Sequence, residues 1–315
     1  MKSEKLRRVG CSDEFILEGD NCMKIDYACL PCLVNQVVRV ADITKAENKD
    51  LLFKKVFAYL SNLDFSKSNP EVIGTTYRLI KEHVKNDDPY GETRTYYNRL
   101  FLSMLDQFDA KIADSDNPFK QALKYAILGN IIDFNPIHNS STEEIMKWFT
   151  NVDKLSLTID HSEKLISDLG SAQTLVYLGD NCGEICLDKL FLKKIKEHNP
   201  SIHIYFGVRG ASIVNDSIED DAYSVGIDEY ADIISNGDDS LGTILSRTSF
   251  EFNHIYQIAD VVISKGQANY ESLSEQVNKN IYFLLMTKCE VIAKNIGVAP
   301  KSVICMNNCN NSNAI

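Results

Sequence analysis

The period of the apolar positions changes along the chain. From residue 27 to about residue 149, apolar residues recur with helical spacing, most clearly in residues 33–41, 52–60 and 100–108. From residue 175 onward, short apolar runs of strand length alternate with helical segments, which is the pattern of βαβ units and a parallel sheet. We therefore predict an α/β protein in which a helical N-terminal subdomain packs on a three-layer α/β/α, Rossmann-like domain with a mainly parallel sheet.

Local signals set the boundaries of these parts. A cap residue stands directly before a proline at Asn69-Pro70, Asp88-Pro89 and Asn117-Pro118, and this pair is typical of a helix start. The segment before Met23 has few apolar residues in register, and the chain from Met306 is rich in asparagine. We predict an extension over residues 1–22, a helical subdomain over 23–155, an α/β domain over 156–305 and a polar tail over 306–315.

One junction between a strand and a helix is the most informative part of the chain. The apolar run at residues 174–178 ends in Gly179-Asp180-Asn181, and an amphipathic helix follows directly. Ligands of open α/β sheets bind beyond the carboxyl ends of the strands, where the free N–H groups of a starting helix favour an anion. Such an anion would meet Asp180, so the pattern indicates a metal ion between them.

Two more apolar runs, at residues 202–208 and 259–264, end in polar residues of complementary chemistry. The residues that follow these runs include Arg209, Asn215, Asp216, Lys265, Gly266, Asn269 and Glu271. Carboxylate and amide oxygens are ligands suited to Mg²⁺ or Mn²⁺, whereas lysine, arginine and helix N-termini bind phosphate oxygens. A single Asp at a strand end is commonly only a helix cap. Three strand ends with complementary groups indicate a metal-assisted phosphoryl site.

The helical half offers one polar spot, where Asn130 and Asp133 follow Gly129 at the end of a helical segment. These residues could simply end a helix. They would reach a substrate if this helix end leans over the edge of the sheet.

Composition limits the classes of partner. The chain has 315 residues, 44% of them hydrophobic, and a formal net charge of −11, which opposes nonspecific binding to nucleic acid or to an anionic membrane. The sequence contains no apolar run of about 18 residues and no secretory signal pattern. We expect a small-molecule partner and a cytoplasmic location, and the pattern does not indicate an oligomeric state.

The nine cysteines favour buried reduced thiols over a defined metal cage. Cys29 and Cys32 have CxxC spacing, but no second CxxC or His pair completes a zinc site, and Cys289 is the best distant partner for them. A thiol site of Cys29, Cys32 and Cys289 therefore stays open. The six histidines show no ligand spacing.

The motifs CLPC, GNIIDF, GDNCGE, VRGASIVND, SKGQANYE and TKCEVIAKNIGV, in this order, resemble the DUF89 or damage-control phosphatase family, in its compact single-module branch. The resemblance spans about residues 23–298. It implies a helical region packed on an α/β/α domain, with one divalent ion at the sheet edge. The implied metal ligands are Asp180, Asn181 and Asp216. The residues implied on the phosphate and substrate side are Lys265, Asn269, Arg209, Glu184, Glu271, Asn130 and Asp133.

The implied activity is removal of phosphate from small phosphometabolites, such as sugar phosphates, phosphopantetheine-type compounds or damaged metabolites. Asp180 and Asp216 would be catalytic, and the ion would be Mg²⁺, Mn²⁺, Co²⁺ or Ni²⁺. We favour an attacking water, although Asp180 could itself be the nucleophile. Two alternatives remain: a carboxyl methyltransferase that uses S-adenosylmethionine, and a thiol-based module for metal binding or redox sensing.

Overall fold

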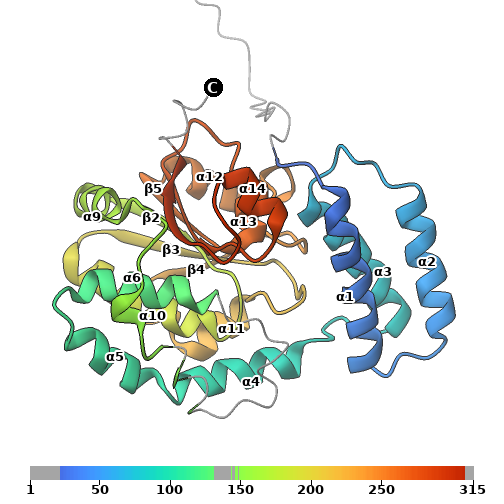
Figure 1. The fold of residues 1–315 in the computed structure, drawn as a ribbon, viewed down its shortest axis with the longest axis horizontal. Coiled ribbons are helices and arrows are strands. Elements are labelled where there is room, and N and C mark those ends of the chain that lie inside the picture. Colours follow the sequence, from blue (N-terminus) through green and yellow to red (C-terminus); the bar gives the residue numbers. More distant parts are fainter. Residues whose placement is uncertain (1–21, 131–142, 144–145, 148, 309–315) are drawn as a thin grey trace, which may run out of the picture.

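The computed structural model describes residues 22–130, 143, 146–147 and 149–308. Its first part is helical, as the apolar spacing predicts (Figure 1). The elements of this part are η1 (Tyr27–Cys29), α1 (Leu30–Ile43), α2 (Lys49–Ser61), α3 (Asn69–Val84), α4 (Gly91–Leu102), α5 (Leu105–Ala113), α6 (Pro118–Gly129) and η2 (Val152–Lys154).

The second part builds a seven-stranded sheet in the order β1-β7-β6-β5-β2-β3-β4. The strands are β1 (Ile159–Asp160), β2 (Thr174–Leu178), β3 (His203–Val208), β4 (Asp232–Ser235), β5 (Val261–Lys265), β6 (Ile281–Met286) and β7 (Val303–Asn307). Neighbouring strands are parallel except for β6 and β7, which are antiparallel. The prediction of an α/β fold with a mainly parallel sheet is therefore confirmed.

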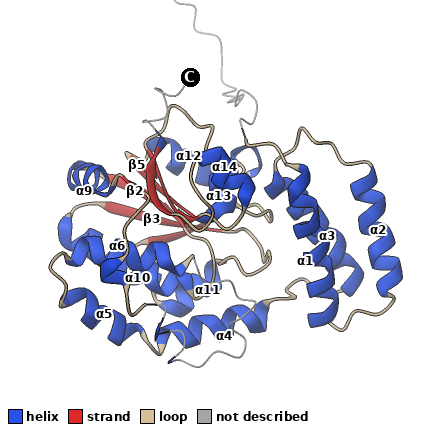
Figure 2. Cartoon of the chain, in the orientation of Figure 1, coloured by secondary structure: helices blue, strands red, loops and turns tan. Residues whose placement is uncertain are grey.

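Helices connect these strands and cover both faces of the sheet (Figure 2). They are α9 (Ser162–Ser171), α10 (Glu184–His198), α11 (Glu219–Val225), η3 (Ile227–Glu229), η4 (Leu245–Arg247), α12 (Phe250–Ile258), α13 (Gly266–Leu273) and α14 (Glu290–Ile296). No helix among the described residues is long and apolar enough to cross a membrane.

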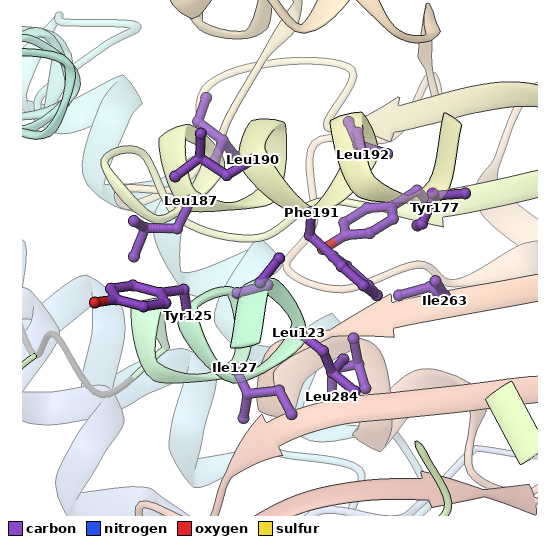
Figure 3. Packing of buried hydrophobic residues seen from close by; sticks show 14 of the residues in the cluster. Leu123, Tyr125, Ile127, Tyr177, Leu187, Leu190, Phe191, Leu192, Ile263 and Leu284 are labelled. Atoms are coloured by element: carbon purple, nitrogen blue, oxygen red, sulfur yellow. The ribbon is translucent and has the colours of Figure 1, made fainter. Parts of the chain in front are cut away.

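Two apolar cores lie on opposite faces of the sheet because side chains alternate along each strand. Tyr177 and Ile263 belong to the core that the sheet shares with α6 and α10, as Figure 3 shows. Val176 and Val262, one position away on the same strands, belong to the core that contains residues of α12, α13 and α14. The two faces are therefore closed by different sets of helices.

The helices of the first part pack in two separate groups. Helices α4 to α6 contribute to the core on one face of the sheet, whereas α1 to α3 lie to the side of the sheet (Figure 1). The division at residue 155 into two domains remains a prediction, and residues 1–21 lie outside the described part. The strand β7 includes Met306 and Asn307, so the predicted start of a polar tail at residue 306 lies too early.

The three Asn/Asp-Pro signals have different outcomes. Asn117 caps α6, because its side chain accepts a hydrogen bond from the Lys120 backbone N–H at 3.0 Å. Pro70 lies in the first turn of α3, but the cap is Ser68, which forms a capping box with Glu71. Asp88 is not a cap, since α4 begins at Gly91 and the Asp88 carboxylate instead pairs with a guanidinium of that helix.

Candidate active site

The three predicted strand ends meet at one edge of the sheet. Strand β2 lies between β3 and β5, and all three run parallel. The chain passes from β2 outward through β3 to β4, and then crosses to the other side of β2 to form β5. Such a reversal of strand order opens a crevice at the carboxyl ends, which is where α/β proteins bind ligands. Asp180, Asp216 and Lys265 all stand at this edge.

Asp180 and Asp216 lie on two loops that bond to each other. The Asp180 backbone oxygen accepts the Ser217 N–H at 2.8 Å, and Asn181 forms a β-bridge with Asp216. The Asp180 Oδ2 atom accepts from the Asn181 Nδ2 at 2.7 Å and from the Asn130 Nδ2 at 3.0 Å. The end of α6 therefore does lean over the sheet edge, and Asn130 touches the site.

Arg209 compensates Asp216 from the side. Its Nε donates to Asp216 Oδ2 at 2.7 Å, and its Nη1 donates to Asn269 Oδ1 at 3.2 Å. The Nη2 atom lies 3.7 Å from Asp180 Oδ1 and has no hydrogen-bond partner among the described residues. Asn269 in turn donates to the backbone oxygens of Gly179 and Lys265, at 3.2 and 2.8 Å. Asn269 therefore holds two strand ends together, and one nitrogen of Arg209 is left for a ligand.

Lys265 lies on the face of the sheet that carries α6 and α10. It is the last residue of β5 and has the same parity as Ile263, so its side chain enters the core between the sheet and these helices. Its ammonium donates to Glu184 Oε1 at 2.7 Å, to Asp188 Oδ1 at 2.5 Å and to the Ala126 backbone oxygen at 2.8 Å. These contacts use all three ammonium protons. The phosphate-binding role implied for Lys265 stays a prediction.

Glu184 connects Lys265 to the amides that bond to Asp180. Its Oε1 accepts from Lys265, while its Oε2 accepts from the Asn181 Nδ2 at 2.9 Å and from the Asn130 Nδ2 at 3.3 Å. Both amides therefore bridge Glu184 to Asp180. In this arrangement Glu184 orients the amides around Asp180.

The site contains an excess of buried negative charge. Among the described residues at the site, four carboxylates (Asp180, Glu184, Asp188 and Asp216) are buried with two buried cations, Arg209 and Lys265. Burial raises the pKa of Asp180 well above its ordinary value, and the charges of Asp216 and Glu184 raise it further. Burial also raises the pKa of Asp216, although Arg209 opposes this shift. An excess of two negative charges is what a divalent cation would neutralise.

The donor set fits such an ion. Asp180, Asn181 and Asp216 offer two carboxylates and one amide, and Mg²⁺ and Mn²⁺ prefer oxygen donors of these kinds. In this arrangement the Asn181 Oδ1 accepts from the Asn215 Nδ2 at 2.7 Å while its Nδ2 faces Asp180, so Asn181 would ligate an ion through the second lone pair of that oxygen or after its amide turns. Among the described residues, no group of three or more His, Cys, Asp or Glu side chains is arranged to hold a metal ion. A site here would therefore need the amide of Asn181 or bound water as further ligands.

Lys288 is a candidate residue that the sequence reasoning missed. It is exposed, and its charge lowers the pKa of both Asp180 and Asp216, so it is close enough to act on these buried carboxylates. Its backbone is anchored beside the site, because its N–H donates to Gln267 and the Met286 N–H donates to Asn130 Oδ1 at 3.5 Å. The sequence feature that could have indicated Lys288 is its position two residues after the end of strand β6.

The remaining predicted residues lie elsewhere. Glu271 is buried on α13 and accepts from the Asn69 Nδ2 at 3.1 Å, and its charge raises the pKa of Cys29 and Cys32. Burial is the larger cause for both thiols and brings the pKa of Cys29 to about 11. Cys289 also contributes to both pKa shifts. Glu271 and Cys289 therefore both lie near Cys29 and Cys32. Asp133 lies outside the described residues.

A separate hollow of about 550 Å³ lies where α5 meets α6, and it contains none of the predicted site residues. Its charged lining residues are of both signs: Lys111, Asp114, Asp116, Lys120, Lys124 and Asp153. This mixture gives no net attraction for an anionic substrate, so we place the site at the sheet edge.

Glu271 makes a pH-dependent stability prediction. Burial raises its pKa from 4.5 to about 7, so its stabilising contribution is complete below 4.5 and is lost as the pH rises through 7. Glu271→Gln removes this loss, because the amide can still accept from Asn69. We therefore compare the unfolding free energy of the variant with that of the wild type at each pH. This difference should favour the variant by about 3 kcal/mol more at pH 8 than at pH 4.5. Urea unfolding of the wild type, the variant and the exposed control Glu275→Gln measures this, and a pH-independent difference would refute it.

Gly266 makes a prediction about close packing. A Cβ at Gly266 would stand 2.0 Å from Asp180 Oδ2, whereas a Cβ at Gly297 would meet nothing within 4 Å. Both glycines have positive φ, +77° and +83°, so alanine carries a similar backbone cost at each. We expect Gly266→Ala to lose about 1–3 kcal/mol more unfolding free energy than Gly297→Ala. Equal losses in urea unfolding would show that the Asp180 carboxylate moves aside freely.

Comparison with known proteins identifies relatives over most of the chain. The model of the damage-control phosphatase ARMT1-like domain matches residues 25–304. The chain is 30% identical to a damage-control phosphatase of Pyrococcus horikoshii, over 91% of this chain and 99% of the relative. It is 33% identical to a damage-control phosphatase of Archaeoglobus fulgidus, over 88% of this chain and 96% of the relative.

A solved structure shows the same fold. The crystal structure of a DUF89 family protein from Pyrococcus horikoshii superimposes with a TM-score of 0.80 at 28% sequence identity, and the match covers 91% of this chain and 99% of that one. The matched region contains every described residue of the site from Asn130 to Lys288. The chain therefore belongs to the damage-control phosphatase ARMT1-like family, also called DUF89.

Proposed function

We propose that this protein is a metal-dependent phosphatase of small phosphate monoesters, acting in the cytoplasm. Family membership supports a phosphatase that acts on damaged metabolites. The observation that carries the proposal is the buried pair Asp180 and Asp216, which belongs to a group of four buried carboxylates with two buried cations. Sugar phosphates and phosphopantetheine-type compounds are the proposed substrate class.

Asp180, Asn181 and Asp216 would hold one divalent ion, Mg²⁺, Mn²⁺, Co²⁺ or Ni²⁺. When bound, this ion would neutralise charge on the phosphoryl group and acidify a water. Asn130 and Asn181 hold the Asp180 carboxylate in place with hydrogen bonds of 3.0 and 2.7 Å. The role of the chain at this point is to keep the carboxylate pair fixed and dry.

Two cationic groups are placed to receive the phosphate. The Arg209 Nη2 atom has no hydrogen-bond partner among the described residues and lies 3.7 Å from Asp180 Oδ1. Lys288 is exposed, and its charge acts on the same carboxylates. Charge-assisted bonds from both groups would hold the phosphate oxygens and strengthen as charge develops. The ammonium of Lys265 bonds to Ala126, Glu184 and Asp188 in this arrangement, and its phosphate-binding role stays a prediction.

The test of the proposed function is phosphate release by the chelator-stripped protein after addition of each divalent ion. Sugar phosphates, phosphopantetheine and an aryl phosphate serve as substrates. We expect release that requires a metal and falls on the order of 100-fold or more in Asp180→Asn and Asp216→Asn. The exposed neighbour Asp220→Asn is the control and should keep wild-type activity.

The absence of phosphate release would also distinguish between the proposals. No release with any ion, from protein that circular dichroism shows to be folded, would refute the phosphatase. Binding of S-adenosylmethionine without a metal would then support the methyltransferase alternative, and stoichiometric zinc on the thiols would support the thiol-based one.

Lys288 makes a separate kinetic prediction. Lys288→Ala removes a charged donor for phosphate, which is worth about 1.5–3 kcal/mol, so kcat/KM should fall roughly 10- to 100-fold. Lys294→Ala, an exposed lysine on α14, is the matched control and should be unchanged. Steady-state kinetics on the best substrate of the panel decide the point. Equal kinetics in the two variants would remove Lys288 from the site.

A further inference from the structure

Helix α4 contacts the Asp180 loop from the face of the sheet that carries α10. The buried Asn98 accepts the Gly183 backbone N–H on its Oδ1 at 2.7 Å, and its backbone oxygen accepts the Cys186 thiol at 3.6 Å. Gly183 is the N-cap residue of α10 and lies three residues after Asp180. One side chain of α4 therefore fixes the point where the Asp180 loop becomes a helix.

The packing at this point is close. Gly183 has a φ of +81°, and a Cβ there would lie 3.1 Å from both Phe101 Cδ2 and Tyr97 Cβ. These two residues flank Asn98 on the same helix and are fully buried. The loop thus packs directly against α4, and the hydrogen bond from the Gly183 N–H to Asn98 is a direct one.

The other end of Asn98 faces the Asp216 loop. Its Nδ2 lies 3.5 Å from Asp221 Oδ1, a weak contact, and Asp221 Oδ2 accepts from the Arg94 Nε at 2.8 Å. The same carboxylate accepts the Ile218 N–H at 3.2 Å, two residues after Asp216. The Cys182 thiol, on the Asp180 loop, also bonds to Asp221. Asp221 and Asn98 therefore link both loops to α4.

We propose that Asn98 is a positioning residue, which anchors the Asp180 loop to α4 and so sets its spacing from the Asp216 loop for metal binding. The metal-binding part of this inference rests on the proposed function. The two loops also bond to each other through the Cys182 N–H and the Asn215 oxygen at 2.9 Å, so a shift of the Asp180 loop after loss of the anchor would disturb this contact as well. Asn98 itself touches neither proposed carboxylate ligand.

The experiment compares Asn98→Ala, which removes the acceptor for Gly183, with Asn98→Asp, which keeps an acceptor oxygen of the same reach and, protonated beside the Asp221 carboxylate, a donor toward it. Thr95→Ala, on the exposed face of the same helix, is the control. The readouts on the full chain are hydrogen–deuterium exchange of the peptide covering residues 179–187 without metal, and Mn²⁺ affinity by calorimetry. Both readouts are independent of turnover.

For Asn98→Ala we expect loop exchange and the Mn²⁺ dissociation constant to rise roughly 10-fold each, as expected for a lost buried hydrogen bond. Asn98→Asp should restore loop exchange to within about 2-fold of wild type, and Thr95→Ala should match wild type in both readouts. Wild-type exchange and affinity in Asn98→Ala would overturn the proposal.

Two further outcomes keep the tests distinct. Failure of the wild-type chain to bind Mn²⁺ would contradict the metal site, while the exchange data would still decide the anchoring role of Asn98. If Asn98→Ala does not fold, Asn98→Asp decides: a folded Asp variant with an unprotected loop overturns the proposal, and a protected loop supports it.

Discussion

The burial of four carboxylates with only two cations is the constraint on which the site depends. Desolvation makes such an arrangement costly unless every oxygen is compensated. Lys265 bonds to two of them, Glu184 and Asp188, and Arg209 bonds to Asp216 from the side. Within the described part of the chain, the Asp180 carboxylate accepts from the amides of Asn130 and Asn181, and the nearest cation, Arg209, lies 3.7 Å away. Asp180 is thus the carboxylate with the least cationic compensation, where a bound cation would gain most.

The elements that bring this charge together could be predicted from the sequence. The apolar runs before Asp180 and Asp216 are long enough to be strands, and parallel strands put their carboxyl ends at one edge. The prediction held because β2, β3 and β5 are immediate neighbours. The contact of Asn130 with the site could only be stated as a condition, since apolar spacing does not say where the end of a helix is packed.

The direction of individual side chains could not be predicted. The third run was expected to end at residue 264, but β5 continues through Lys265, and one additional strand residue decides which face a side chain enters. Glu271 shares the helix of Asn269, yet it bonds to Asn69 of α3. Asn98 carries no local signal, because its importance comes from contacts between elements far apart in the chain.

The outer strands of the sheet have a consequence for how the protein behaves at high concentration. One edge is β1, which has two residues, and the other is β4, which has four and begins with the exposed Asp232. Long, flat and apolar edges invite pairing with strands of other molecules, whereas short edges that carry charge discourage it. The strands β2, β5 and β6, whose residues are almost all buried, are enclosed between neighbours. The sheet can therefore hold a charged site at its end without presenting a template for aggregation along its sides.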